Sequence, residues 1–67
     1  MMNYDEAIKL LKNAVKHSHL DDQKHIDLTL VDANLRDVYQ NALVTVNRAV
    51  AEGKLTRDQL RHDLGLV

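Results

Sequence analysis

Residues 53–66 read Gly-Lys-Leu-Thr-Arg-Asp-Gln-Leu-Arg-His-Asp-Leu-Gly-Leu, and they specify a short helix at both of its ends. The Thr56 hydroxyl can accept a hydrogen bond from the Gln59 amide, while the Gln59 side chain can reach back to the Thr56 amide, as in a capping box. Leu55 and Leu60 occupy the two positions of a hydrophobic staple. The pattern therefore predicts that a helix begins directly after Thr56.

The end of this helix is marked as clearly as its start. Gly65 can supply the left-handed residue that terminates a helix, and Leu66 beyond it can fold back onto Leu60. The sequence therefore predicts a helix over residues 57–64, which needs another element to pack on. The leucines available for that packing are Leu55, Leu60, Leu64 and Leu66.

Residues 55–66 resemble the first helix and the turn of a helix-turn-helix DNA-binding protein. In that family the helix after the turn carries the side chains that read the bases. In this sequence only Val67 follows the resembling stretch. The resemblance therefore implies a capped helix and its turn, and it implies no recognition helix.

The chain has little material for a hydrophobic core. It contains 67 residues, no cysteine, and Tyr4 and Tyr39 as its only aromatic residues. Ordering a chain of this size costs on the order of 100 kcal/mol, which aliphatic side chains alone offset with difficulty. We therefore expect residues 1–67 to form one helical domain that is stabilised by association, most simply as a homodimer.

The charge balance argues against a protein that binds polyanions. Nine Lys and Arg residues stand against ten Asp and Glu residues, a net charge of −1, whereas nucleic-acid-binding domains usually carry a clear basic excess. The sequence also lacks a signal peptide pattern and the ~20-residue apolar run of a membrane span. We expect a cytoplasmic protein without a membrane partner, of bacterial or phage type.

Residues 1–52 contain neither proline nor glycine, which favours long helices. Apolar residues at three- and four-residue steps predict an amphipathic helix over residues 3–18, with Asn3 as its N-cap. The apolar side of this helix consists of Tyr4, Ala7, Ile8, Leu11, Ala14 and Val15.

A second apolar stripe predicts the central helix over residues 32–52, with Gly53 as the residue that terminates it. Its start can be capped either by Thr29, with Asp32 three residues later, or by Asp32 itself. Because one partner helix would not cover the whole stripe, part of it is predicted to face another chain, with Tyr39 as the anchor. The predicted interface residues are Leu35, Val38, Tyr39, Ala42, Leu43, Val46 and Val50.

Just before the central helix, Ile26, Leu28 and Leu30 alternate with polar residues. One interpretation is an extended or single-turn lead-in that places three apolar side chains on the helices. The other is a short strand that pairs with its copy in a second subunit, because a lone strand has no partner within this chain.

Histidines cluster after the first helix. If that helix continued through the polar linker, His17, Asp21 and His25 would lie one turn apart, with ligand atoms that suit zinc or nickel. We interpret them instead as solvated residues at a helix C-terminus, where a histidine cation is mildly favourable. The sequence therefore predicts neither a metal nor another cofactor.

A basic row on the first helix consists of Lys9, Lys12 and Lys16. At this spacing the row is most simply the solvated face of an amphipathic helix, and the alternative is a stripe that binds nucleic acid or an acidic protein. Asp21 and Asp22 follow directly and argue against nucleic acid.

The residues needed for catalysis are scarce. Ser18 is the only serine, cysteine is absent, and Gly53 and Gly65 are the only glycines. Neither an activated nucleophile with an oxyanion loop nor a phosphate-binding loop can be assembled from them. A thin helical core also leaves no room for the pocket of several hundred Å³ that small molecules usually need. No enzymatic activity and no small-molecule substrate are therefore predicted.

Taken together, these patterns predict an all-α domain in which a long helical hairpin is closed by a short C-terminal helix. The predicted function is that of a small accessory or regulatory module that binds another protein or its own copy. The alternative is a nucleic-acid-associated regulator, in which a dimer combines the lysine rows of both chains into one basic surface.

Overall fold

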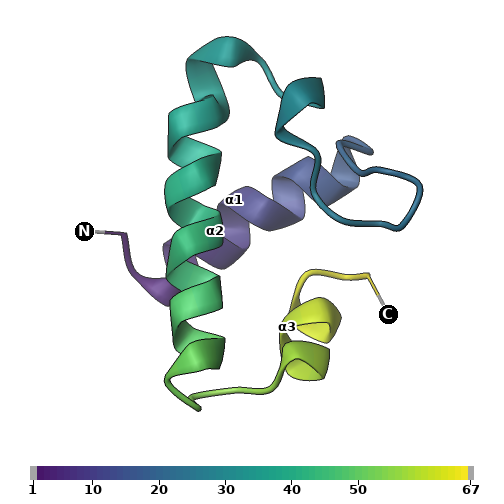
Figure 1. Ribbon diagram of the computed structural model, residues 1–67. Coiled ribbons are helices and arrows are strands. Elements are labelled where there is room, and N and C mark those ends of the chain that lie inside the picture. Colours follow the sequence, from purple (N-terminus) through teal and green to yellow (C-terminus); the bar gives the residue numbers. More distant parts are fainter. Residues whose placement is uncertain (1, 67) are drawn as a thin grey trace.

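The computed structural model describes residues 2–66, and Figure 1 shows how its helices are arranged. The described residues form an all-α structure without a strand, as predicted. Its α-helices are α1 (Tyr4–Lys16), α2 (Arg36–Ala51) and α3 (Arg57–Asp63), and two 3-10 turns, η1 (Leu28–Leu30) and η2 (Ala33–Leu35), lead into α2.

Side-chain caps set the first residues of α1 and α3. The Asn3 carbonyl oxygen Oδ1 accepts a hydrogen bond of 2.8 Å from the Glu6 amide. At α3, the Thr56 hydroxyl accepts from the Gln59 amide at 3.1 Å, and the Gln59 Oε1 accepts from the Thr56 amide at 2.9 Å. The predicted N-cap and the predicted capping box are both confirmed.

The variant Thr56→Ala is expected to lower the free energy of unfolding by about 1 kcal/mol, because it removes the side-chain acceptor at the start of α3. Thr45→Ala is the control, since the Thr45 hydroxyl donates to the Asn41 carbonyl inside α2 at 2.8 Å and caps no helix end. Urea unfolding followed by circular dichroism measures both variants. Equal midpoints for the two variants would show that the cap contributes no stability.

Each of the three helices is followed, two residues beyond its last residue, by a residue with a left-handed backbone. These residues are Ser18 (φ 60°), Gly53 (φ 77°) and Gly65 (φ 79°). The next amide then donates back into the last turn, as His19 does to the Ala14 carbonyl at 2.9 Å. The two glycine ends confirm the prediction, whereas the end of α1 at Lys16 was not marked in the sequence, because serine rarely adopts this conformation.

Two aspartates organise the turns before α2. The Asp27 carboxylate accepts hydrogen bonds from the Thr29 amide at 2.9 Å and from the Thr29 hydroxyl at 2.6 Å, and these bonds lower the pKa of Asp27. The Asp32 carboxylate accepts from the Asn34 amide at 2.9 Å and starts η2. Asp32 is therefore the cap, although it caps a 3-10 turn and the α-helix itself begins at Arg36.

The apolar segment before α2 is a single-turn lead-in and not a strand. Leu28 lies in η1, and Ile26 forms one isolated bridge with Leu20 of the same chain. Ile26 and Leu28 pack against the core, but Leu30 remains exposed. The Arg36 Nε holds the turn to α2 by donating to the Leu28 carbonyl at 2.9 Å.

The helices α1 and α2 cross at a wide angle and do not run side by side as a long hairpin (Figure 1). Ala7, Ala14 and Ala42 are fully buried, and their small side chains let the two backbones approach closely. The segment between the helices separates the end of α1 from the start of α2. A second core cluster connects this segment to both helices, and it consists of Ala14, Val31 and Tyr39. The predicted hairpin geometry is therefore corrected to a crossed pair.

The helix α3 completes the main core cluster, which joins all three helices. Its buried members are Ala7, Leu11, Ala42, Val46, Leu60 and Leu64. Leu55 and Leu66 pack against this cluster from either end of α3. The four leucines thus lie against the core as the sequence pattern predicts. None of the helices within residues 2–66 is both long enough and apolar enough to cross a membrane.

Candidate functional site

Four large apolar side chains remain strongly exposed among the described residues, and all of them lie between residues 30 and 44. They are Leu30 (52% exposed), Leu35 (47%), Val38 (38%) and Val44 (44%). We call these four residues the apolar set. They belong to η1, η2 and α2, whereas α1 and α3 contribute no member.

The predicted interface residues divide into buried and exposed groups. Tyr39, Ala42 and Val46 lie inside the core of the chain itself, so the structure corrects their assignment to an intermolecular contact. Leu43 and Val50 are partly buried against the main cluster. Leu35 and Val38 are the predicted interface residues that remain strongly exposed, while Leu30 and Val44 were not predicted to face a partner.

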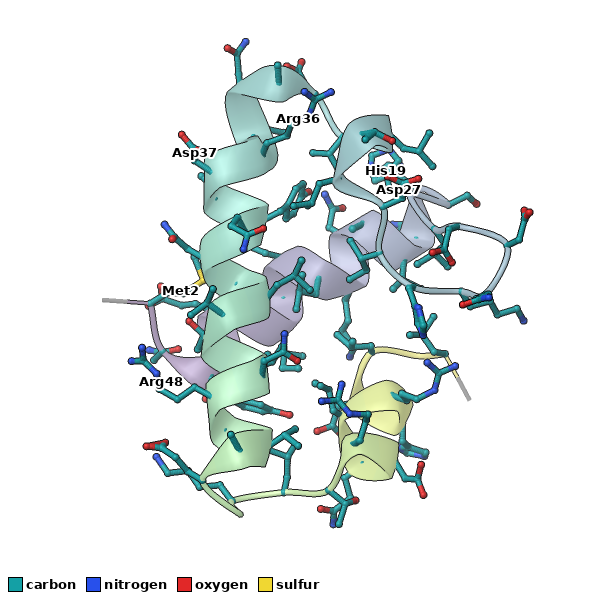
Figure 2. The ribbon with its side chains drawn as sticks, viewed as in Figure 1. Met2, His19, Asp27, Arg36, Asp37 and Arg48 are labelled. Atoms are coloured by element: carbon teal, nitrogen blue, oxygen red, sulfur yellow. The ribbon has the colours of Figure 1, made fainter. Side chains whose placement is uncertain are left out.

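A line of exposed residues runs along the side of α2 that α1 leaves uncovered. It consists of Asp37, Asn41, Val44 and Arg48, and we call it the outer seam. Figure 2 shows Asp37 and Arg48 on the same side of α2, near its opposite ends. Within residues 2–66 neither charge has an ionic partner, because the ion pair found there joins Lys54 to Glu52 at 3.5 Å.

An open groove lies along part of the outer seam. Asn41, Val44 and Arg48 line one side, and residues of the α1 N-terminus and of α3, among them Met2 and Gln59, line the others. Its volume of about 1500 Å³ exceeds the roughly 300–1,000 Å³ of small-molecule pockets. The sequence did not reveal this groove, because segments far apart in the chain form its walls. Its size and openness suit an extended partner better than a small molecule.

One end of the groove is held together by a hydrogen bond between α1 and the end of α3. The Tyr4 hydroxyl donates to the Asp63 Oδ2 at 3.1 Å. Partial burial, followed by the hydrogen bond and the negative charge of Asp63, raises the pKa of Tyr4 from 10.0 to about 12. Folding therefore favours the protonated phenol at this position.

This shift predicts a stability change at alkaline pH. The pKa of Tyr4 is higher in the folded state than in the unfolded state. The stabilisation that the protonated phenol adds to the free energy of unfolding is therefore fully present below pH 10, and it is lost as the pH rises toward about 12. The wild type should therefore lose more stability over this range than Tyr4→Phe, which cannot ionise. Urea unfolding at several alkaline pH values measures the difference. Parallel pH profiles for the two proteins would rule out a raised pKa for Tyr4.

The lysine row is exposed on α1, as predicted, but carboxylates lie near it. Lys9, Lys12 and Lys16 are all solvent-exposed. A shallow depression beside Lys9 and Lys12 is also lined by Asp5 and Asp63. These acidic neighbours lower the positive potential that a phosphate backbone would meet.

The structure does not bring His17, Asp21 and His25 together as ligands. The left-handed backbone at Ser18 ends α1, so no helix continues toward His25. The Asp21 carboxylate instead accepts a hydrogen bond of 2.9 Å from the backbone amide of His25. Within residues 2–66, no group of three potential ligands is placed to hold a metal ion.

Comparisons of this chain with protein families, with curated proteins and with solved structures found no match.

Proposed function

We propose that this chain is a protein–protein interaction module, which binds through the outer side of α2 and the turns that lead into it. A second copy of the chain is the simplest partner. The observation that carries the proposal is the placement of the apolar set on consecutive elements of the fold. Large apolar side chains that stay exposed in the folded chain can mark a surface that another protein covers.

The size of the core supports a role for association. Within residues 2–66, Leu11 and Val46 are the largest side chains that are fully buried. Small domains bury only a modest share of the surface that the unfolded chain exposes, so their stability is marginal. Burial of the apolar set against a partner would add apolar contacts that the single chain lacks.

The variants Leu35→Asp and Val44→Asp test this proposal, because both residues are exposed and a charged side chain there stays in contact with water. Sedimentation velocity from low micromolar to near-millimolar concentration is expected to show association of the wild type. Both variants should stay closer to the monomer mass of 7.7 kDa. Lys12→Asp, on the exposed face of α1, is the control and should associate as the wild type does.

The proposal fails if two results coincide. The first is that the wild type remains monomeric at every concentration. The second is that, from the same cell extract, the immobilised wild type and immobilised Leu35→Asp retain the same proteins. In that case the exposed apolar residues would have no binding role.

The competing proposal is a nucleic-acid-associated regulator, and the observation in its favour is the exposure of all three lysines in the row. Fluorescence anisotropy with nonspecific DNA distinguishes the two. Binding that weakens steeply with salt, and that is lost in the variant Lys9→Glu/Lys12→Glu, would favour the nucleic-acid alternative.

A further inference from the structure

The outer seam has the spacing of a helix-pairing surface. Asp37, Asn41, Val44 and Arg48 are separated by four, three and four residues, so they lie along one line of α2. All four are exposed, and they end in opposite charges with Val44 between them. The seam is therefore charged at its two ends and contains an apolar residue near its middle.

This pattern is complementary to itself when it is reversed. In an antiparallel pair of identical helices, each residue faces the one that lies equally far on the other side of the two-fold axis. An axis that passes between Ala42 and Leu43 places Asp37 opposite Arg48 of the partner subunit, and Asn41 opposite Val44 of the partner subunit. A parallel pair would instead place like charges against each other.

We infer that the partner is a second copy of this chain, whose α2 docks antiparallel on α2 in this register. The inference rests on the proposed function, since it names the partner proposed there. Of the apolar set, Val44 lies on the seam, whereas Leu30, Leu35 and Val38 lie outside it. Each end of the seam then carries an ion pair between Asp37 of one subunit and Arg48 of the other. The two copies of Val44 lie on either side of the two-fold axis and are offset by about 4.5 Å along the direction of the helices.

The rest of the fold leaves room for this arrangement. The opposite side of α2, with Tyr39, Ala42 and Val46, is already buried within the chain. Asn41, Val44 and Arg48 line the open groove, so their side chains are accessible from outside the chain. A partner helix can therefore approach the seam without displacing an element of the core.

The contact is small, so the dimer is expected to be weak. α2 has 16 residues, which corresponds to a length of about 24 Å. One helix pair of this length buries less than the roughly 1,200–2,000 Å² of a standard interface, which places it among transient associations. Dimerisation should therefore become visible only toward the upper end of the micromolar range.

Charge reversal tests the register. Asp37→Arg and Arg48→Asp are each expected to weaken dimerisation by about tenfold, because the symmetry turns two attractive contacts into repulsive contacts at once. The double variant Asp37→Arg/Arg48→Asp exchanges the two charges and should restore wild-type dimerisation. Sedimentation equilibrium measures the dissociation constant, and circular dichroism verifies that each variant is folded.

A mismatched double variant is the control. Asp58 stands in the first turn of α3, just as Asp37 stands in the first turn of α2. Asp58→Arg/Arg48→Asp therefore has the same net charge as the rescuing variant, but it places no cation opposite position 48. It should dimerise as weakly as Arg48→Asp alone. Recovery in the mismatched variant would show that only overall charge matters, and it would overturn the inferred register.

The remaining outcomes separate the inference from the proposed function. If the wild type dimerises and Leu35→Asp abolishes the dimer while the charge reversals have no effect, the register is wrong and the interaction module stands. If the wild type stays monomeric but retains another protein in a manner that depends on Leu35 or Val44, self-association is overturned and the module again stands. If neither self-association nor a retained protein is found, both proposals fail.

Discussion

Leu11→Ala is expected to lower the free energy of unfolding by about 2–5 kcal/mol. Leu11 is fully buried in the main cluster, where α1, α2 and α3 meet. Its truncation removes apolar contacts and leaves a cavity that a small core cannot close. A domain of this size has a total stability of only about 3–10 kcal/mol, so the loss is a large share of the whole.

The matched control is Leu30→Ala, the same substitution at a side chain that is 52% exposed. Urea unfolding followed by circular dichroism should show a large shift of the midpoint for Leu11→Ala and almost none for Leu30→Ala. Similar shifts for the two variants would mean that Leu11 is not at the centre of the core.

The features that the sequence predicted correctly depend on short-range interactions. Thr56 and Gln59 form the capping box because they lie three residues apart, whatever surrounds them. Gly53 and Gly65 end their helices because glycine adopts positive φ without a steric penalty. These local signals were sufficient to identify three helices and most of their ends.

The crossing of α1 and α2 and the structure of the segment between them could not be predicted in the same way. Ser18 takes a left-handed backbone that a serine rarely adopts, so α1 stops without a glycine. The Asp21 carboxylate then accepts hydrogen bonds from the Gln23 and His25 amides, both at 2.9 Å, and closes a tight turn. A segment that composition presents as an ordinary polar linker is therefore ordered, and it sets where α2 begins.

The candidate site was located only in part, because the apolar stripe of α2 has two sides. The width of the stripe predicted that part of it faces another chain, and Leu35 and Val38 of the stripe do remain exposed in the single chain. The width could not show which members turn outward, since that depends on the crossing of the helices. Val44 was missed because it lies outside the stripe, on a face of the helix where its neighbours Asn41 and Arg48 are polar. Tyr39, by contrast, lies inside the stripe but is buried against α1 and the lead-in.

The position of Tyr39 leads to the second large effect. Tyr39 is only 3% exposed, and it forms the smaller core cluster together with Ala14 and Val31. Tyr39→Ala is therefore expected to lower the free energy of unfolding by about 3–5 kcal/mol, the usual cost of removing a buried aromatic ring. This cluster fills the space between the end of α1 and the start of α2, so its loss should destabilise that junction first.

Tyr39→Phe is the control, because it keeps the ring and removes only the hydroxyl. That hydroxyl accepts a hydrogen bond of 3.2 Å from the Asn13 side-chain amide, and its loss should cost about 0.5–1.5 kcal/mol. Urea unfolding at a low protein concentration, where a weak dimer is dissociated, isolates the effect on the single chain. If Tyr39→Ala were as stable as the wild type there, and only the dissociation constant of the dimer changed, Tyr39 would face the partner as the stripe first suggested. A large loss of stability in the monomer instead places Tyr39 in the core and leaves the outer seam as the surface for association.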